Sequence, residues 1–153
     1  MLRHVLLGST LVACLLLVLA EFGDLNHIHI VTVSRSGVRV GSHHGYALLI
    51  LGVVAGVMGF GAWRGSRPAA LAVAVLGLVA LLIVVLVDLP DVDATGLYGR
   101  DYEQASASAS AGFKLEAAGA ILLLFTGVMT IVRPRLGAAS TRSRRETAPE
   151  GDG

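Results

Sequence analysis

The sequence predicts an all-α membrane protein, a four-helix transmembrane bundle with a small β-hairpin in the first extracytoplasmic loop. Three observations support this fold class. Of the 153 residues, 54% are hydrophobic and only 15% are charged, whereas soluble domains carry about 25% charged residues. The mean hydropathy is +0.73. The apolar residues are also concentrated in four long segments with polar connections between them.

Each of these segments is close to the length that crosses a bilayer. A hydrocarbon core of about 30 Å takes about 20 helical residues. The predicted spans cover approximately residues 5–22, 46–63, 69–87 and 113–132, and together they form one transmembrane domain over residues 1–132. The connections 23–45 and 88–112 are the predicted outer loops. Helices are expected because the bilayer offers backbone polar groups no water to bond.

The basic residues orient the predicted bundle. Most of them lie at the N-terminus, in the short turn 64–68 or after Val132: Arg3, Arg64, Arg67, Arg133, Arg135, Arg142, Arg144 and Arg145. The outer connections hold the others, Arg35, Arg39, Arg100 and Lys114, and most of the acids. Because basic residues near helix ends stay cytoplasmic, we expect both termini inside, with a disordered cytoplasmic tail over 133–153. The excess of arginine over lysine suggests a GC-rich bacterial genome, and hence a multi-pass protein of the bacterial plasma (inner) membrane.

The first segment allows a second interpretation. It has a basic start, an apolar core and a small residue, Ala20, at its end, as a cleavable signal peptide does. Its apolar run is longer than a typical signal core of roughly 7–15 residues. This length favours a retained helix.

Small residues at helical spacing mark the second segment. They let two membrane helices approach closely, and here they are Gly52, Ala55, Gly56 and Gly59. We expect this stripe to pack against another helix of the same chain. The alternative is a face that forms a homodimer.

Four of the five histidines lie in the first outer loop: His27, His29, His43 and His44. β-Branched residues on both sides of Ser36-Gly37 predict a β-hairpin that turns at these two residues. In that register His29 lies opposite His44, and a slip of one residue pairs it with His43. Imidazole groups bind Zn²⁺ or Cu²⁺ and titrate near neutral pH. The histidines are therefore candidate metal ligands or pH-responsive groups, and the simpler interpretation is a polar strand at the membrane interface.

The second outer loop ends in a tract of alternating alanine and serine over residues 104–112. This low-complexity stretch is expected to be flexible or to extend the fourth helix.

The charged residues that touch the apolar segments all lie at their outer ends: Glu21, Asp88, Lys114 and Glu116. Since Lys114 has carboxylates available from three helix ends, we predict an ion-paired cluster there. Ionisable groups at membrane depth are candidate functional residues, although these four are shallow and pairing explains them.

Motifs for chemistry are absent from the sequence. The lone Cys14 forms neither a disulfide nor a Cys-x-x-Cys site, and no catalytic triad, phosphate loop or cofactor motif occurs. We therefore expect no enzyme activity, no cofactor and no nucleic-acid partner, since a cytoplasmic flank explains the basic tail. Besides the lipid bilayer, the expected partner is a protein or a second copy of the chain, bound through the outer loops or the glycine stripe.

The leading hypothesis is a non-catalytic accessory or interaction subunit that presents its outer loops to a partner. The alternative is a metal- or pH-responsive sensor or transporter component that uses the four loop histidines. A third class, an enzyme acting on lipid-linked substrates, depends on whether the outer charged residues form a polar pocket.

Overall fold

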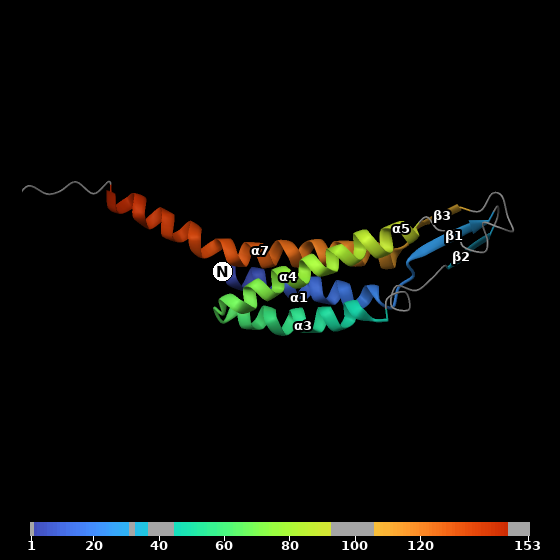
Figure 1. Ribbon diagram of the computed structural model, residues 1–153, viewed down its shortest axis with the longest axis horizontal. Helices are drawn as coiled ribbons and strands as arrows, with labels where there is room; N and C mark the ends of the chain where they lie inside the picture. The colour runs from blue at the N-terminus through green and yellow to red at the C-terminus, as the bar shows by residue number, and fades with distance from the viewer. Residues whose placement is uncertain (1, 31–32, 37–44, 93–105, 147–153) are drawn as a thin grey trace, which may run out of the picture.

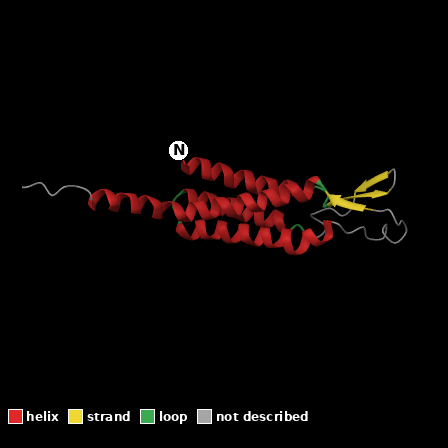
Figure 2. Ribbon diagram, turned by 90° about the horizontal axis from the view of Figure 1, so that it is seen from above, coloured by secondary structure: helices red, strands yellow, loops and turns green. Residues whose placement is uncertain are grey.

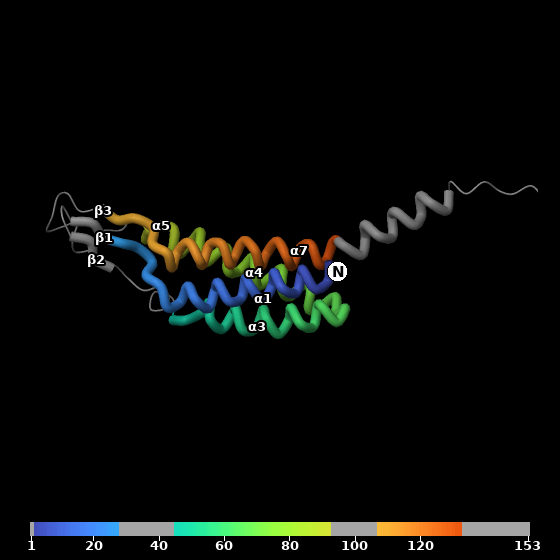
Figure 3. The backbone as a smooth tube through the Cα atoms, turned by 180° about the vertical axis from the view of Figure 1, so that it is seen from behind, coloured from blue at the N-terminus to red at the C-terminus, as the bar shows by residue number. Residues whose placement is uncertain are grey.

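The protein consists of long helices with a small β-sheet at one end (Figure 1). A computed structural model describes residues 2–30, 33–36, 45–92 and 106–146. The long helices are α1 (Leu2–Ala20), α3 (Ala47–Trp63), α4 (Arg67–Ile83) and α7 (Ala111–Glu146). They lie side by side, and α1 and α4 each contact both α3 and α7 (Figures 1 and 2). The N-terminus and the α3–α4 turn lie at the end opposite the sheet (Figure 3).

Three of the four predicted spans are confirmed as helices long and apolar enough to cross a membrane. They cover Leu2–Ala20, Arg67–Val92 and Ala111–Val132. The fourth, α3, is also apolar but has only 17 residues, which corresponds to about 26 Å at the α-helical rise. The structure therefore supports a multi-pass membrane protein, in which the span 46–63 stays a prediction.

The outward surface of the helices is apolar. Large hydrophobic side chains are exposed on each long helix, among them Leu15, Ile50, Leu71 and Ile121. The buried side chains between the helices include many small ones, such as Ala13, Ala55 and Ala120. A helix that is apolar on both its inner and its outer face is typical of a membrane span.

The third apolar segment continues beyond the predicted end of its span. After α4 the chain forms a π-helical turn, η1 (Val84–Asp88), and then α5 (Leu89–Val92). The N–H of Leu89 donates to the carbonyl of Val84, five residues earlier. Pro90 lacks an N–H, and its ring crowds the carbonyl four residues before it. A wider turn just before the proline lets the helix continue to Val92.

The small β-sheet contains one strand more than the predicted hairpin. Strands β1 (Asn26–Ile30), β2 (Val33–Ser36) and β3 (Ser106–Ala109) pair antiparallel in the order β2-β1-β3. The predicted turn at Ser36-Gly37 is wrong, because Ile30 already pairs with Val33 and Ser36 lies opposite His27. Strand β1 pairs along both of its edges, with β2 and with β3. These two partners together determine the register, which the residues of a turn cannot determine alone.

The alanine-serine tract is neither flexible throughout nor an extension of the last helix, as the sequence had suggested. Residues Ser106–Ala109 form β3, and α7 begins two residues later at Ala111. Small residues have little strand propensity of their own, so the pairing with β1 decides their conformation. At its other end α7 runs to Glu146. Part of the tail that we expected to be disordered is therefore helical.

The glycine stripe of α3 faces α1. A Cβ atom on Gly52 would lie 3.3 Å from the Cys14 carbonyl oxygen, and one on Gly59 would lie 2.7 Å from Cγ2 of Thr10. Ala55 on the same stripe is fully buried. The closest helix contact lies elsewhere, between α4 and α7: a Cβ on Gly77 would come 2.4 Å from the Leu124 nitrogen. Small residues thus allow close packing within the chain.

Candidate functional site

Three acidic side chains are buried together where the helices meet the sheet. Glu21 directly follows α1, Asp88 ends η1, and Glu116 lies in the second turn of α7. Their exposed fractions are 1%, 0% and 0%. Acidic residues are rarely buried so completely unless they have partners. The hydrogen bonds and neighbours of each carboxyl group therefore indicate the role of the cluster.

Glu21 interacts with the first turn of α3. Its Oε1 accepts a hydrogen bond of 3.0 Å from the backbone N–H of Leu49. The residue that precedes the helix, Tyr46, has a left-handed backbone with φ 58° and makes no side-chain cap. An acceptor with negative charge at a helix N-terminus is favourable, because the first N–H groups lack partners within the helix. Glu21 thus supplies from α1 the cap that α3 lacks.

Glu116 and Asp88 join the other two helix ends. The carboxyl group of Glu116 lies close enough to those of Asp88 and Glu21 for their charges to interact. Like charges that lie so near one another in a buried site repel each other when ionised. The cluster thus brings acidic groups from the ends of α1, η1 and α7 together.

Lys114 does not join this cluster, which corrects the prediction of an ion-paired group. Its side chain is exposed, whereas Glu116 is fully buried. Residues two apart on an α-helix point about 200° away from each other, so these two cannot both face the interior. Within the described part of the chain, no ion pair joins Lys114 to the acids. The three carboxyl groups are buried inside the described part of the protein.

The base of the sheet is tied to the same helix ends. The Ser110 backbone N–H donates to the Leu25 carbonyl at 3.2 Å, and the Ser110 hydroxyl donates to the Asp24 carbonyl. The Asn26 side chain donates to the Asp91 carbonyl in α5 at 3.2 Å. These contacts join the segment after α1, the end of the α4–α5 helix and the start of α7. The sheet is therefore held at its base by three separate parts of the chain.

Glycine allows the closest contact at this base. A Cβ on Gly112 would lie 2.4 Å from the Asp24 carbonyl oxygen, and one on Gly23 would lie 2.8 Å from the Gly112 Cα. Sequence reasoning missed Gly23, Gly112 and Ser110. Their only signal was that a glycine directly follows the first apolar segment and another precedes the last. Neither glycine indicates its partner by itself.

The histidines do not form the predicted arrangement. In the register of the sheet His29 lies opposite Ser34 and Ser106, and His27 lies opposite Ser36 and Ser108. His43 and His44 lie outside the described residues. Among the residues that the structure describes, no three histidine, cysteine, aspartate or glutamate side chains gather as a metal-binding group. The described part of the first outer loop therefore pairs β1 histidines with serines.

Comparison with known proteins gives no relative: no family model, no curated protein and no solved structure matches the chain.

Proposed function

We propose that the chain is a non-catalytic, multi-pass membrane protein that presents its β-sheet to a protein partner outside the membrane. The supporting observation is the sheet that projects beyond the helix ends and is braced at its base (Figures 1 and 2). A surface on a rigid support loses little conformational freedom when a partner binds. Its described edges, β2 and β3, suit a partner that adds an extended segment.

The membrane placement in this proposal follows from the charges. Arg3, Arg64 and Arg67 lie at the end of the helices opposite the sheet, while the buried acids lie next to the sheet. By the positive-inside rule the arginine-bearing end is cytoplasmic. We infer that α3 is the fourth span of a transmembrane bundle, that both termini are inside, and that the sheet lies outside a bacterial plasma membrane.

The buried acids have a structural role in this proposal. Glu21 caps α3, and the carboxyl groups of Asp88 and Glu116 meet between η1 and α7. These links hold the helix ends from which the sheet begins. The outer connections would then display a partner-binding surface, and the helices would anchor it.

A photo-crosslinking amino acid at Ser108 tests the proposal in native membranes. Ser108 is exposed in β3, and the matched control position is Leu86, which is 67% exposed on the side of η1. We expect irradiation to produce a protein adduct from Ser108 that Leu86 does not give. The mass of the adduct distinguishes a different protein from a second copy of the chain. Absence of any adduct from Ser108 and from its neighbour Ala107 would overturn the proposal.

A further inference from the structure

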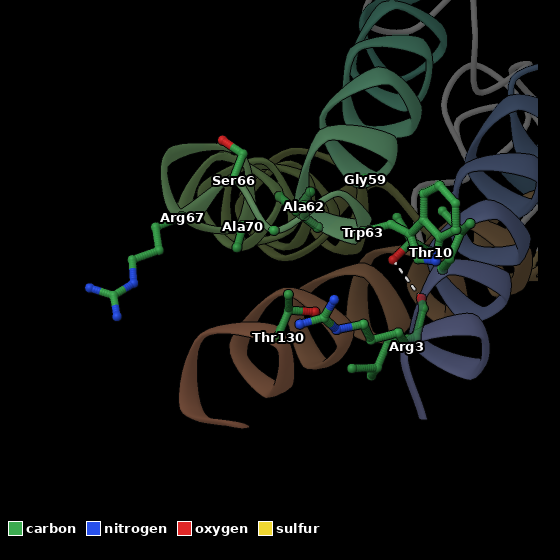
Figure 4. A pocket seen from close by; sticks show the side chains of 13 residues that line it. Arg3, Thr10, Gly59, Ala62, Trp63, Ser66, Arg67, Ala70 and Thr130 are labelled. Carbon is green, nitrogen blue, oxygen red and sulfur yellow. Dashed lines mark hydrogen bonds between the residues drawn. The ribbon is translucent and has the colours of Figure 1, made fainter. Parts of the chain in front are cut away.

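A cavity of about 290 Å³ lies at the end of the helices opposite the sheet. Residues from all four long helices line it, including Arg3 of α1, Trp63 of α3, Ala70 of α4 and Thr130 of α7 (Figure 4). Its lining includes no residue of the acidic cluster or of the sheet.

The polar part of the cavity is cationic. Arg3 extends across the cavity so that its guanidinium group lies beside Thr130, while Arg67 at the start of α4 points away from it (Figure 4). Among the described residues that line the cavity, none is acidic. The positive charge of Arg3 therefore faces no opposite charge in the described part of the wall. An arginine fork in such surroundings suits a phosphate group, which accepts hydrogen bonds and carries negative charge.

The helix ends near the cavity strengthen its preference for an anionic group. Both α1 and α4 begin at this end of the molecule, at Leu2 and Arg67, so the positive ends of their dipoles lie near the cavity. Ser66 caps α4 by accepting a hydrogen bond of 3.4 Å from the Ala69 N–H. The positive ends of α1 and α4 add to the field of Arg3, while the negative C-terminal end of α3 at Trp63 offsets part of it.

The rest of the cavity wall is apolar. Leu6 and Leu7 of α1 and Val73 of α4 line it beside the polar groups. The Trp63 ring packs edge-on against His4, with 6.0 Å between ring centroids, and lies tilted against Phe60 at 5.5 Å. Tryptophan is enriched at the level of lipid headgroups. The ligand must therefore be an amphiphile, with an anionic group at Arg3 and hydrocarbon along the leucines.

We propose that this cavity binds an anionic phospholipid of the cytoplasmic leaflet. The phosphate group binds the Arg3 guanidinium, and the acyl chains leave along the apolar wall into the bilayer. The Thr130 hydroxyl donates to the Thr126 carbonyl at 2.7 Å, so it is not a donor to the phosphate. Basic pockets between membrane helices on the cytoplasmic side are a known means of binding such headgroups. The proposal rests on the orientation proposed above, with the arginine-bearing end on the cytoplasmic side of a membrane, but it does not depend on a partner at the sheet.

The single tryptophan provides a direct test. Trp63 is the only tryptophan of the chain and lines the cavity, so its fluorescence reports on the lipid bound there. The protein is reconstituted into phosphatidylcholine vesicles that contain either brominated phosphatidylglycerol or brominated phosphatidylcholine at the same mole fraction. Bromine quenches tryptophan at short range. We expect stronger quenching by the phosphatidylglycerol, with a relative affinity about tenfold higher than that of phosphatidylcholine.

Three variants separate the cavity from general surface charge. Arg3→Gln should remove the preference for phosphatidylglycerol, and Arg3→Lys should retain part of it because the charge stays. Arg64→Gln is the matched control, since Arg64 carries the same charge at the same end but packs over the Phe60 ring at 5.7 Å outside the cavity lining. In Arg64→Gln, quenching of Trp63 by the two brominated lipids should match that in the wild type. An equal loss in Arg3→Gln and Arg64→Gln, or no preference in the wild type, overturns the proposal.

Inorganic phosphate distinguishes a lipid from a free phosphate ligand. It is titrated into protein in vesicles of phosphatidylcholine alone, with Trp63 fluorescence as the readout. We expect no saturable change, because inorganic phosphate carries no acyl chain that could cover the apolar wall of the cavity. A saturable change with phosphate, together with equal quenching by the two brominated lipids, would assign the cavity to a free anion and refute the lipid assignment.

Discussion

The carboxyl group of Glu21 caps a helix to which it does not belong, because its Oε1 accepts a hydrogen bond of 3.0 Å from the Leu49 backbone N–H. Glu21 follows α1, and Leu49 lies in the first turn of α3. Strands β1 and β2 lie between them in the chain. The hydrogen bond thus joins the end of α1 to the start of α3, on either side of these strands.

Replacing Glu21 with alanine should lower the free energy of unfolding by about 1 kcal/mol, as the loss of a helix cap does. Glu21→Gln should lose less, since its amide oxygen still accepts the bond from Leu49. The measurement is unfolding by sodium dodecyl sulfate in mixed micelles, followed by circular dichroism. A loss in Glu21→Gln as large as that in Glu21→Ala would contradict the role of this hydrogen bond.

Replacing Glu116 with glutamine should raise the free energy of unfolding by about 1 kcal/mol, because it removes one of three acidic groups that lie close together in a buried site. Lys114→Gln is the matched control on the same helix turn. Its side chain is exposed, so its effect should stay within about 0.5 kcal/mol. Strong destabilisation by Glu116→Gln would show that the acid itself is required.

The contact between α4 and α7 should tolerate no additional carbon atom at Gly77. A Cβ there would lie 2.4 Å from the Leu124 nitrogen, whereas one on Gly56 would meet only the Cys14 Sγ at 3.9 Å. Gly77→Ala should therefore destabilise the fold by about 1–3 kcal/mol. Gly56→Ala should be neutral, or stabilising by less than about 1 kcal/mol, because alanine favours a helix. Equal effects of the two substitutions in the same unfolding assay would contradict this packing.

Accessibility to a membrane-impermeant maleimide tests the orientation. Single cysteines are placed at Ser108 in β3 and at Arg64 in the α3–α4 turn, in a Cys14→Ala background, since Cys14 is the only cysteine of the chain. In intact cells the reagent should label the cysteine at Ser108 and leave the one at Arg64 unlabelled. Both should react after the membrane is permeabilised. Labelling at Arg64 in intact cells would reverse the proposed orientation.

The grouping of Glu21, Asp88 and Glu116 follows from their common position at the ends of apolar segments. The direction in which each side chain points does not follow from that position. Burial of Glu116 and exposure of Lys114 depend on how α7 is rotated against α1 and α4, which contacts between distant residues decide. The same reason explains why Leu49 could not be identified from the sequence as the partner of Glu21, and why the cavity at Arg3 was not expected.

The sequence by itself determined the apolar segments, the distribution of arginines and acids between their ends, and the small residues that permit close helix contacts. These properties depend on neighbours in the chain and can be summed over a short window. Only the tertiary structure decided the third strand, the continuation of α4 through Pro90, the register of the histidines and the contact of Gly77 with Leu124. Each of these depends on a surface supplied by a distant segment, and the free energy of that contact outweighs local preference.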